Sequence, residues 1–140
     1  EHIKGFQNIR DLLVARIDFS SFRWSDCLWL ALLAAIPEEI LFRGAMQPTL
    51  GLLLTALIFG VLHGITRLYL IYAIGAGLLL GILYEYHETL WLPIATHFAV
   101  DYFSLIWLSN WARQQIPPPD PLQDLQAIGI ADRGDDLESL

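Results

Sequence analysis

Long apolar runs alternate with short polar breaks along the chain, and the runs approach the length of a membrane span. Four segments are predicted to be helices, at residues 27–46, 50–63, 68–86 and 90–108. The last two are close to the ~20 residues that a helix needs to cross a bilayer. The second is shorter, which indicates a tilted, partner-covered or re-entrant helix. The pattern predicts an all-α polytopic membrane protein, with about four core transmembrane helices around a polar cavity.

The two ends of the chain differ from this apolar middle. Residues 1–25 mix charges with apolar positions at helical spacing, which predicts an interfacial amphipathic segment. Residues 112–140 form an acidic tail with several prolines, which break helices, and we expect no catalytic role there. The predicted organisation is therefore an interfacial segment at 1–25, an intramembrane core at 26–111 and a tail at 112–140.

Basic residues predict how the core lies in the membrane. Four spans would place both termini and the second loop on one side. The basic residues of that side are Lys4, Arg10, Arg16, Arg23, Arg67 and Arg113. The other side has only Arg43, so the positive-inside rule predicts that both termini of this region are cytoplasmic. Gly77 and Gly81 have the small-xxx-small spacing that lets helices approach closely in lipid.

Composition supports this class and excludes others. The chain is 55% hydrophobic and 16% charged, whereas an average soluble domain has about 25% charged residues. The net charge is −7 and there is no basic run, so we expect membrane lipids as partners and no nucleic acid. The single cysteine, Cys27, has no second cysteine in the chain with which to form a disulfide.

Two adjacent carboxylates lie within the first apolar run. Glu38 and Glu39 come 11 and 12 residues after Cys27, about 17 Å along a helix and near the middle of a ~30 Å hydrocarbon core. Asp101 lies at a similar depth from Leu90. A charge at the bilayer centre costs ~2.5–3.5 kcal/mol on the gentlest scale. An ionisable residue at this depth is therefore a candidate functional residue.

Helical spacing groups these polar residues. Glu39 and Arg43 are four apart, so they share a helix face and we expect an ion pair. Glu38 is then the freer carboxylate and a candidate general base. His97 and Asp101 are also four apart, so several helices each present polar groups from one face.

Two chemistries fit this set of residues. In the first, Glu38 and His63 orient and deprotonate a water, and His97 and Asp101 stabilise the oxyanion formed when water attacks a peptide carbonyl. In the second, Glu38, His63 and His97 are ligands of a divalent metal such as zinc, with an open position for water. The spacing does not separate the two.

Three short motifs carry a resemblance to a known family. They are EEILFRG at 38–44, FGVLH at 59–63 and HFAVD at 97–101. In order and spacing they resemble the EExxxR, FxxxH and His-xxx-Asn/Asp signatures of the CAAX-protease and bacteriocin-processing (CPBP, or Abi) membrane proteins. The resemblance covers roughly residues 24–110. It implies an intramembrane endopeptidase like the type II CAAX prenyl endopeptidases, acting on membrane-associated peptides or proteins, of which prenylated CAAX-type substrates are one class.

The resemblance also implies roles for individual residues. Glu38 and His63 would activate the water, and Glu39 would pair with Arg43. The third motif, His97 and Asp101, would stabilise the oxyanion. Many family members have Asn where this chain has Asp101, and an Asp donates a hydrogen bond only when protonated. The resemblance leaves open whether a metal takes part.

Two functions of other classes stay open. The first is a non-proteolytic membrane scaffold or immunity-type protein of the same family, which would keep its function when Glu38 is replaced by Gln. The second is a proton or ion transporter that uses the carboxylates and histidines as a relay. Many transporters have inverted repeats or broken-helix pairs, and we see neither in this sequence.

Overall fold

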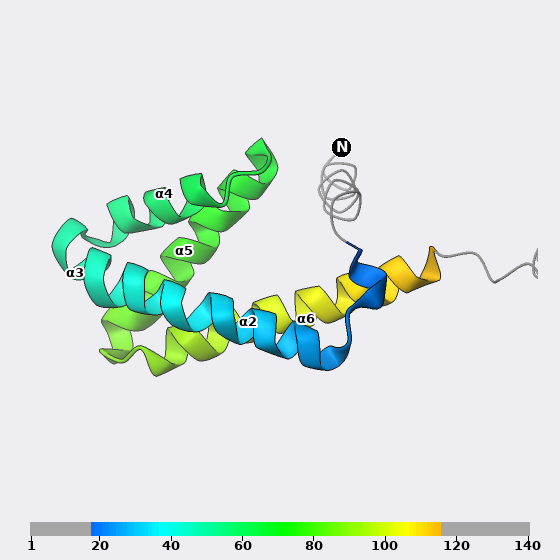
Figure 1. Ribbon diagram of the computed structural model, residues 1–140. Helices are drawn as coiled ribbons and strands as arrows, with labels where there is room; N and C mark the ends of the chain where they lie inside the picture. The colour runs from blue at the N-terminus through cyan, green and yellow to red at the C-terminus, as the bar shows by residue number, and fades with distance from the viewer. Residues whose placement is uncertain (1–17, 116–140) are drawn as a thin grey trace, which may run out of the picture.

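The computed structural model describes residues 18–115, which are helical and contain no strand (Figure 1). The elements are the 3₁₀ turn η1 (Phe19–Ser21), α2 (Trp24–Glu39), the π-helix η2 (Ile40–Met46), α3 (Gln47–Leu50), α4 (Leu52–Leu62), α5 (Arg67–His87) and α6 (Trp91–Gln114). The predicted all-α class is confirmed. Most of the predicted interfacial segment and nearly all of the predicted tail lie outside the described residues.

The helices form two pairs that meet along α5 and α6. In Figure 1, α2 lies beside α6 and α4 lies beside α5. The chain continues from α2 through η2 and α3 without a break in helical winding, and α5 also packs against α6. The helix that carries the first motif therefore contacts α6 near its start and approaches α5 near its end.

The first helix continues through a proline. Pro37 lies inside α2, and the Ile40 N–H reaches the carbonyls of both Ile36 and Pro37. After that residue the winding changes to a π-helix, in which the Gln47 N–H bonds the Phe42 carbonyl, five residues back. Single stretches of π winding inside helices are often found at functional sites.

Small residues line the inside of this bundle and large apolar residues cover its outside. The buried residues include Ala31, Ala35, Ala56, Ala73, Gly60, Gly77 and Gly81. The exposed ones include Leu33, Leu53, Leu62, Ile71, Trp91 and Phe103. This distribution is the reverse of a soluble core and is typical of helices packed in lipid.

Two glycines show how close the helices approach. A Cβ on Gly60 would lie 2.2 Å from Ile74 Cγ1, and a Cβ on Gly77 would lie 3.3 Å from the Cα and O of Ala56. The close approach that the Gly77–Gly81 spacing predicted is therefore present between α4 and α5.

Among residues 18–115, one helix is long and apolar enough to cross a membrane, namely α5 with 21 residues. The apolar helix α4 has 11 residues and is shorter than a span. The helix α6 is long enough, with 24 residues, but it carries several polar side chains. The number of spans stays a prediction.

Candidate active site

Three helical segments bring the residues of the three motifs to one place. These residues are Glu38 and Glu39 at the end of α2, Arg43 in η2, His63 at the end of α4, and His97 and Asp101 on α6. The segments are far apart in the sequence, so the fold rather than local spacing assembles the cluster.

Glu39 lies at the buried centre of the cluster. Its side chain and that of Arg43 are 0% and 1% exposed, and Arg43 Nη1 donates to Glu39 Oε1 at 2.9 Å. The expected ion pair is therefore present. Arg43 Nη2 donates to the Gly77 carbonyl at 2.9 Å. The guanidinium is thus bonded to its own helix and to α5, which fixes the Glu39 carboxylate in place.

The second contact of Glu39 sets the orientation of His97. His97 Nδ1 lies 2.8 Å from the same Oε1 atom. An ionised carboxylate can only accept, so Nδ1 carries the proton of this bond. His97 Nε2 therefore points to the other side, where it lies 3.3 Å from Asp101 Oδ2. Helical spacing could not predict the contact between His97 and Glu39, because these residues are on different helices.

Glu38 is the more accessible of the two adjacent carboxylates. Its side chain is 29% exposed, against 0% for Glu39. Its Oε2 atom lies 3.5 Å from His63 Nε2 and 3.9 Å from His97 Nε2. This oxygen has no hydrogen-bond partner among residues 18–115. The oxygen itself is buried, and both distances are longer than a usual hydrogen bond but too short for a water to fit between the atoms. A water bonded to both groups would therefore lie beside them.

Phe59 holds the ring of His63 toward Glu38. His63 Nδ1 lies 2.8 Å from the Phe59 carbonyl, so Nδ1–H donates there and Nε2 is left to face Glu38. The two rings stack with centroids 4.3 Å apart. Arg43 Cζ lies 4.9 Å from the centroid of Phe59, within cation–π range. The phenylalanine of the second motif therefore orients the histidine and packs on the buried arginine.

The geometry does not fit a metal ion as it stands. Within residues 18–115, no group of three or more His, Cys, Asp or Glu side chains is placed to hold one. The bonds of the two imidazoles to the Phe59 carbonyl and to Glu39 use Nδ1 and leave each Nε2 facing Glu38. Histidines that bind metals are oriented in the same way, so these bonds do not count against a metal, and metal dependence stays a prediction.

A further polar residue follows the first motif. Gln47, at the start of α3, is 4% exposed, and its Nε2 donates to the Gly81 carbonyl at 3.0 Å and to Glu85 Oε1 at 3.1 Å. The sequence analysis did not single it out. An amide four residues after Arg43, in an otherwise apolar stretch, was the signal that could have found it.

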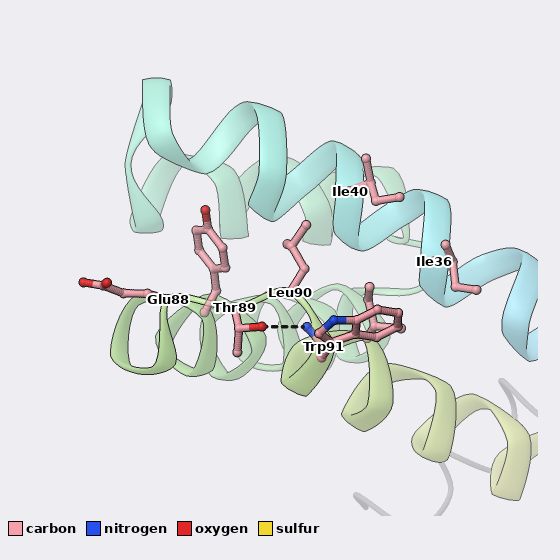
Figure 2. A pocket seen from close by; sticks show the side chains of 8 residues that line it. Ile36, Ile40, Glu88, Thr89, Leu90 and Trp91 are labelled. Atoms are coloured by element: carbon pink, nitrogen blue, oxygen red, sulfur yellow. Dashed lines mark hydrogen bonds between the residues drawn. The ribbon is translucent and has the colours of Figure 1, made fainter.

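An apolar groove lies between the end of α2 and the turn that joins α5 to α6. Its volume is about 570 Å³, and it is lined by Ile36, Ile40, Tyr84, Glu88, Thr89, Leu90, Trp91 and Ile94. Figure 2 shows Ile36 and Ile40 on the upper helix and Thr89, Leu90 and Trp91 on the turn below, where the Trp91 N–H donates to Thr89 Oγ1 at 3.4 Å. None of the six motif residues lines this groove.

The buried ion pair, the two histidines and the second carboxylate form a cluster of ionisable groups on helices with an apolar exterior, which marks a candidate functional site in a membrane protein. A sequence model of the type II CAAX prenyl endopeptidase Rce1-like family matches residues 20–103, which is more than half of the 140 residues. The chain belongs to this family, and the match includes all six motif residues. Proteins of this family are membrane-embedded, and at the level of the family the match implies CAAX-type protease activity.

One curated relative is similar over part of the chain. It is the uncharacterized protein YpbD of Bacillus subtilis (strain 168), which is 39% identical over 86 residues. The aligned stretch is 59% of this chain and 46% of the relative, so the chain spans less than half of that protein's length. No solved structure matches the chain.

Proposed function

We propose that the protein is an intramembrane endopeptidase that hydrolyses peptide bonds of membrane-associated substrates with a water activated by Glu38 and His63. The observation that carries this proposal is the position of Glu38 Oε2, which lies 3.5 Å from His63 Nε2 and has no hydrogen-bond partner among the described residues. A water bonded to both groups would lie beside this pair of atoms, where the carboxylate can accept its proton, as a general base must.

The residues support the following reaction. Glu38 takes a proton from the water while the water oxygen attacks the carbonyl carbon of the peptide bond. His63 Nε2 holds the water for this attack, because its Nδ1 is bonded to the Phe59 carbonyl. The proton held by Glu38 then passes to the amine that leaves as the C–N bond breaks. The net change is one water added across one peptide bond.

The opposite side of the site would stabilise the negative charge on the carbonyl oxygen. His97 lies 3.9 Å from Glu38 through its Nε2 atom, and Asp101 lies 3.3 Å from the same nitrogen. Because an ionised Asp101 can only accept, its role is to orient His97. Nδ1–H of His97 already donates to Glu39, so the ring must also carry a proton on Nε2, as the imidazolium, to donate to the developing charge. Glu39 and Arg43 do not touch the substrate in this account, and they hold His97 in place.

The substrate would reach the site from the membrane. The exposed apolar side chains of α2, α4, α5 and α6 favour a multi-pass protein with lipids around it. The excess of basic residues on one side of the predicted spans favours cytoplasmic termini. Prenylated CAAX-type peptides are one class of substrate that the family membership suggests, and membrane peptides without a prenyl group are another.

The proposal is tested by cleavage of a membrane-peptide library, prenylated and unmodified, with purified protein in mild detergent. The wild type is expected to cleave at least one peptide, and Glu38→Gln is expected to cleave none while it keeps its fold. The matched control is Asp26→Asn, which changes an exposed carboxylate in the first turn of the same helix. If folded wild type cleaves no peptide, the protein acts as a scaffold instead. If Glu38→Gln cleaves as well as wild type, the protein is a protease but Glu38 is not its base.

A further inference from the structure

A second set of hydrogen bonds joins the first-motif helix to α5, one turn beyond Arg43. Arg43 Nη2 donates to the carbonyl of Gly77 at 2.9 Å, and Gln47 Nε2 donates to the carbonyl of Gly81 at 3.0 Å. Gln47 also donates to Glu85 Oε1 at 3.1 Å. The donors are four residues apart on one helix and the acceptors are four apart on the other. The two helices are therefore bonded at two successive, equivalent positions.

Both donors belong to the stretch of helix with π winding. Arg43 lies inside η2, which covers Ile40–Met46, and Gln47 follows directly as the first residue of α3. The two side chains are therefore about one turn apart and reach the same neighbouring helix, α5.

The surface of α5 is shaped to receive the Gln47 side chain. A Cβ on Gly81 would lie 2.7 Å from Gln47 Oε1 and would overlap Leu52 Cδ1, so a larger residue here would push both side chains aside. Gln47 itself is 4% exposed. A buried amide costs free energy unless it is hydrogen-bonded, and both of its bonds are made to α5.

We propose that Gln47 is a positioning residue for the hydrolysis. Its bonds to Gly81 and Glu85 hold η2 against α5, which keeps the hydrogen bond from Arg43 to Gly77 and the hydrogen bond from His97 to Glu39 in place. This inference rests on the proposed function of the same site. Gln47 and Arg43 both bond backbone carbonyls of α5, those of Gly81 and Gly77. Arg43 in turn bonds Glu39 at 2.9 Å, and Glu39 bonds His97 at 2.8 Å. Gln47 itself touches none of the reacting groups.

The kinetic test compares Gln47→Leu with the matched control Thr49→Ala, which changes an exposed side chain on the same short helix. Leucine fills the site but donates no hydrogen bond. Because small displacements of catalytic groups act on the rate of the chemical step, Gln47→Leu is expected to lower kcat about 10-fold and to leave KM unchanged. The loss is counted per folded molecule, from the melting curve of the same sample. Thr49→Ala is expected to match wild type.

A second variant covers the case in which Gln47→Leu does not fold. Glu85→Ala removes only the outer acceptor, and the Glu85 side chain is exposed, so this variant leaves no buried gap. It is expected to lower kcat about 3-fold, in the same direction and again without a change in KM. If both variants keep wild-type kcat per folded molecule, Gln47 only packs the helices and the inference is overturned.

A spectroscopic readout separates this inference from the proposed function. The ¹⁵N signals of the His97 imidazole, assigned with a His97→Gln sample, report the bond from Nδ1 to Glu39 without any substrate. They are expected to shift in Gln47→Leu and to stay unchanged in Thr49→Ala. Unchanged His97 signals in Gln47→Leu overturn the coupling even if activity falls. If wild type cleaves nothing, the proposed function fails, and these signals still decide whether Gln47 holds His97.

Discussion

Replacing Arg43 tests how much the buried centre of the site contributes to stability. Arg43 is 1% exposed, and it bonds both Glu39 Oε1 and the Gly77 carbonyl, each at 2.9 Å. Breaking a buried pair by removing one partner typically costs about 3–5 kcal/mol, because the other charge is left in place without compensation. Arg43→Ala is therefore expected to lower the free energy of unfolding by about 3 kcal/mol or more.

Arg43→Lys gives an intermediate case that tests the geometry. A lysine keeps the charge, but its single ammonium group cannot reproduce the planar fork that reaches Glu39 and Gly77 together. The loss of one hydrogen bond to a charged group is expected to cost about 1.5–3 kcal/mol. The order of stability should therefore be wild type, then Arg43→Lys, then Arg43→Ala. The free energy is measured by reversible unfolding, with denaturing detergent titrated into protein held in mild detergent.

The matched control is Arg113→Ala near the end of α6. Arg113 also donates to backbone carbonyls, those of Ser20 and Phe22, but it is exposed. Exposed contacts of this kind contribute about 0–1 kcal/mol. A double-mutant cycle of Arg43→Ala with Glu39→Gln should also show coupling of about 0.5–3 kcal/mol. Equal losses at Arg43 and Arg113, or no coupling in the cycle, would refute the argument from burial.

Three further outcomes follow from the structure. Gly77→Ala should destabilise by about 1–3 kcal/mol in the same unfolding assay, because its Cβ would lie 3.3 Å from the backbone of Ala56. Gly75→Ala should be neutral or stabilise by up to about 1 kcal/mol, because nothing lies within 4 Å of its Cβ. Equal effects at the two glycines would contradict the close helix contact. His63→Gln should abolish peptide cleavage. It should leave the melting temperature nearly unchanged, because the side chain is 30% exposed. Retained cleavage would show that His63 takes no part in the proposed reaction. Cleavage should also survive dialysis against a chelator, and a loss that zinc restores would assign a metal to this site.

The sequence predicted those features that depend on local spacing. Helical periodicity placed Glu39 and Arg43 on one face, and the structure pairs them at 2.9 Å. The order of the three motifs on apolar helices predicted the all-α class and the family. Small residues spaced four apart predicted the close contact at Gly77. Each of these features can be read within a few turns of one helix.

Features that depend on contacts between helices were missed. The sequence indicated His97 as a partner of Asp101, whereas in the structure its Nδ1 also bonds Glu39, which is 58 residues away. The π-helix at Ile40–Met46 was not predicted, because the spacing of apolar residues does not reveal a local change of winding. Gln47 was not recognised, because its acceptor at Gly81 is a backbone carbonyl, which carries no sequence signal of its own.

In the proposed reaction, a water bound at Glu38 hydrolyses the peptide bond. The most direct measurement is mass spectrometry of the products when a cleaved membrane peptide is incubated with the protein in H₂¹⁸O. The wild type is expected to place ¹⁸O in the new carboxyl terminus. Glu38→Gln, folded to the same extent, is expected to give no labelled product. Folded wild type that yields no labelled carboxyl terminus, or Glu38→Gln that labels it as fast as wild type, would contradict the account.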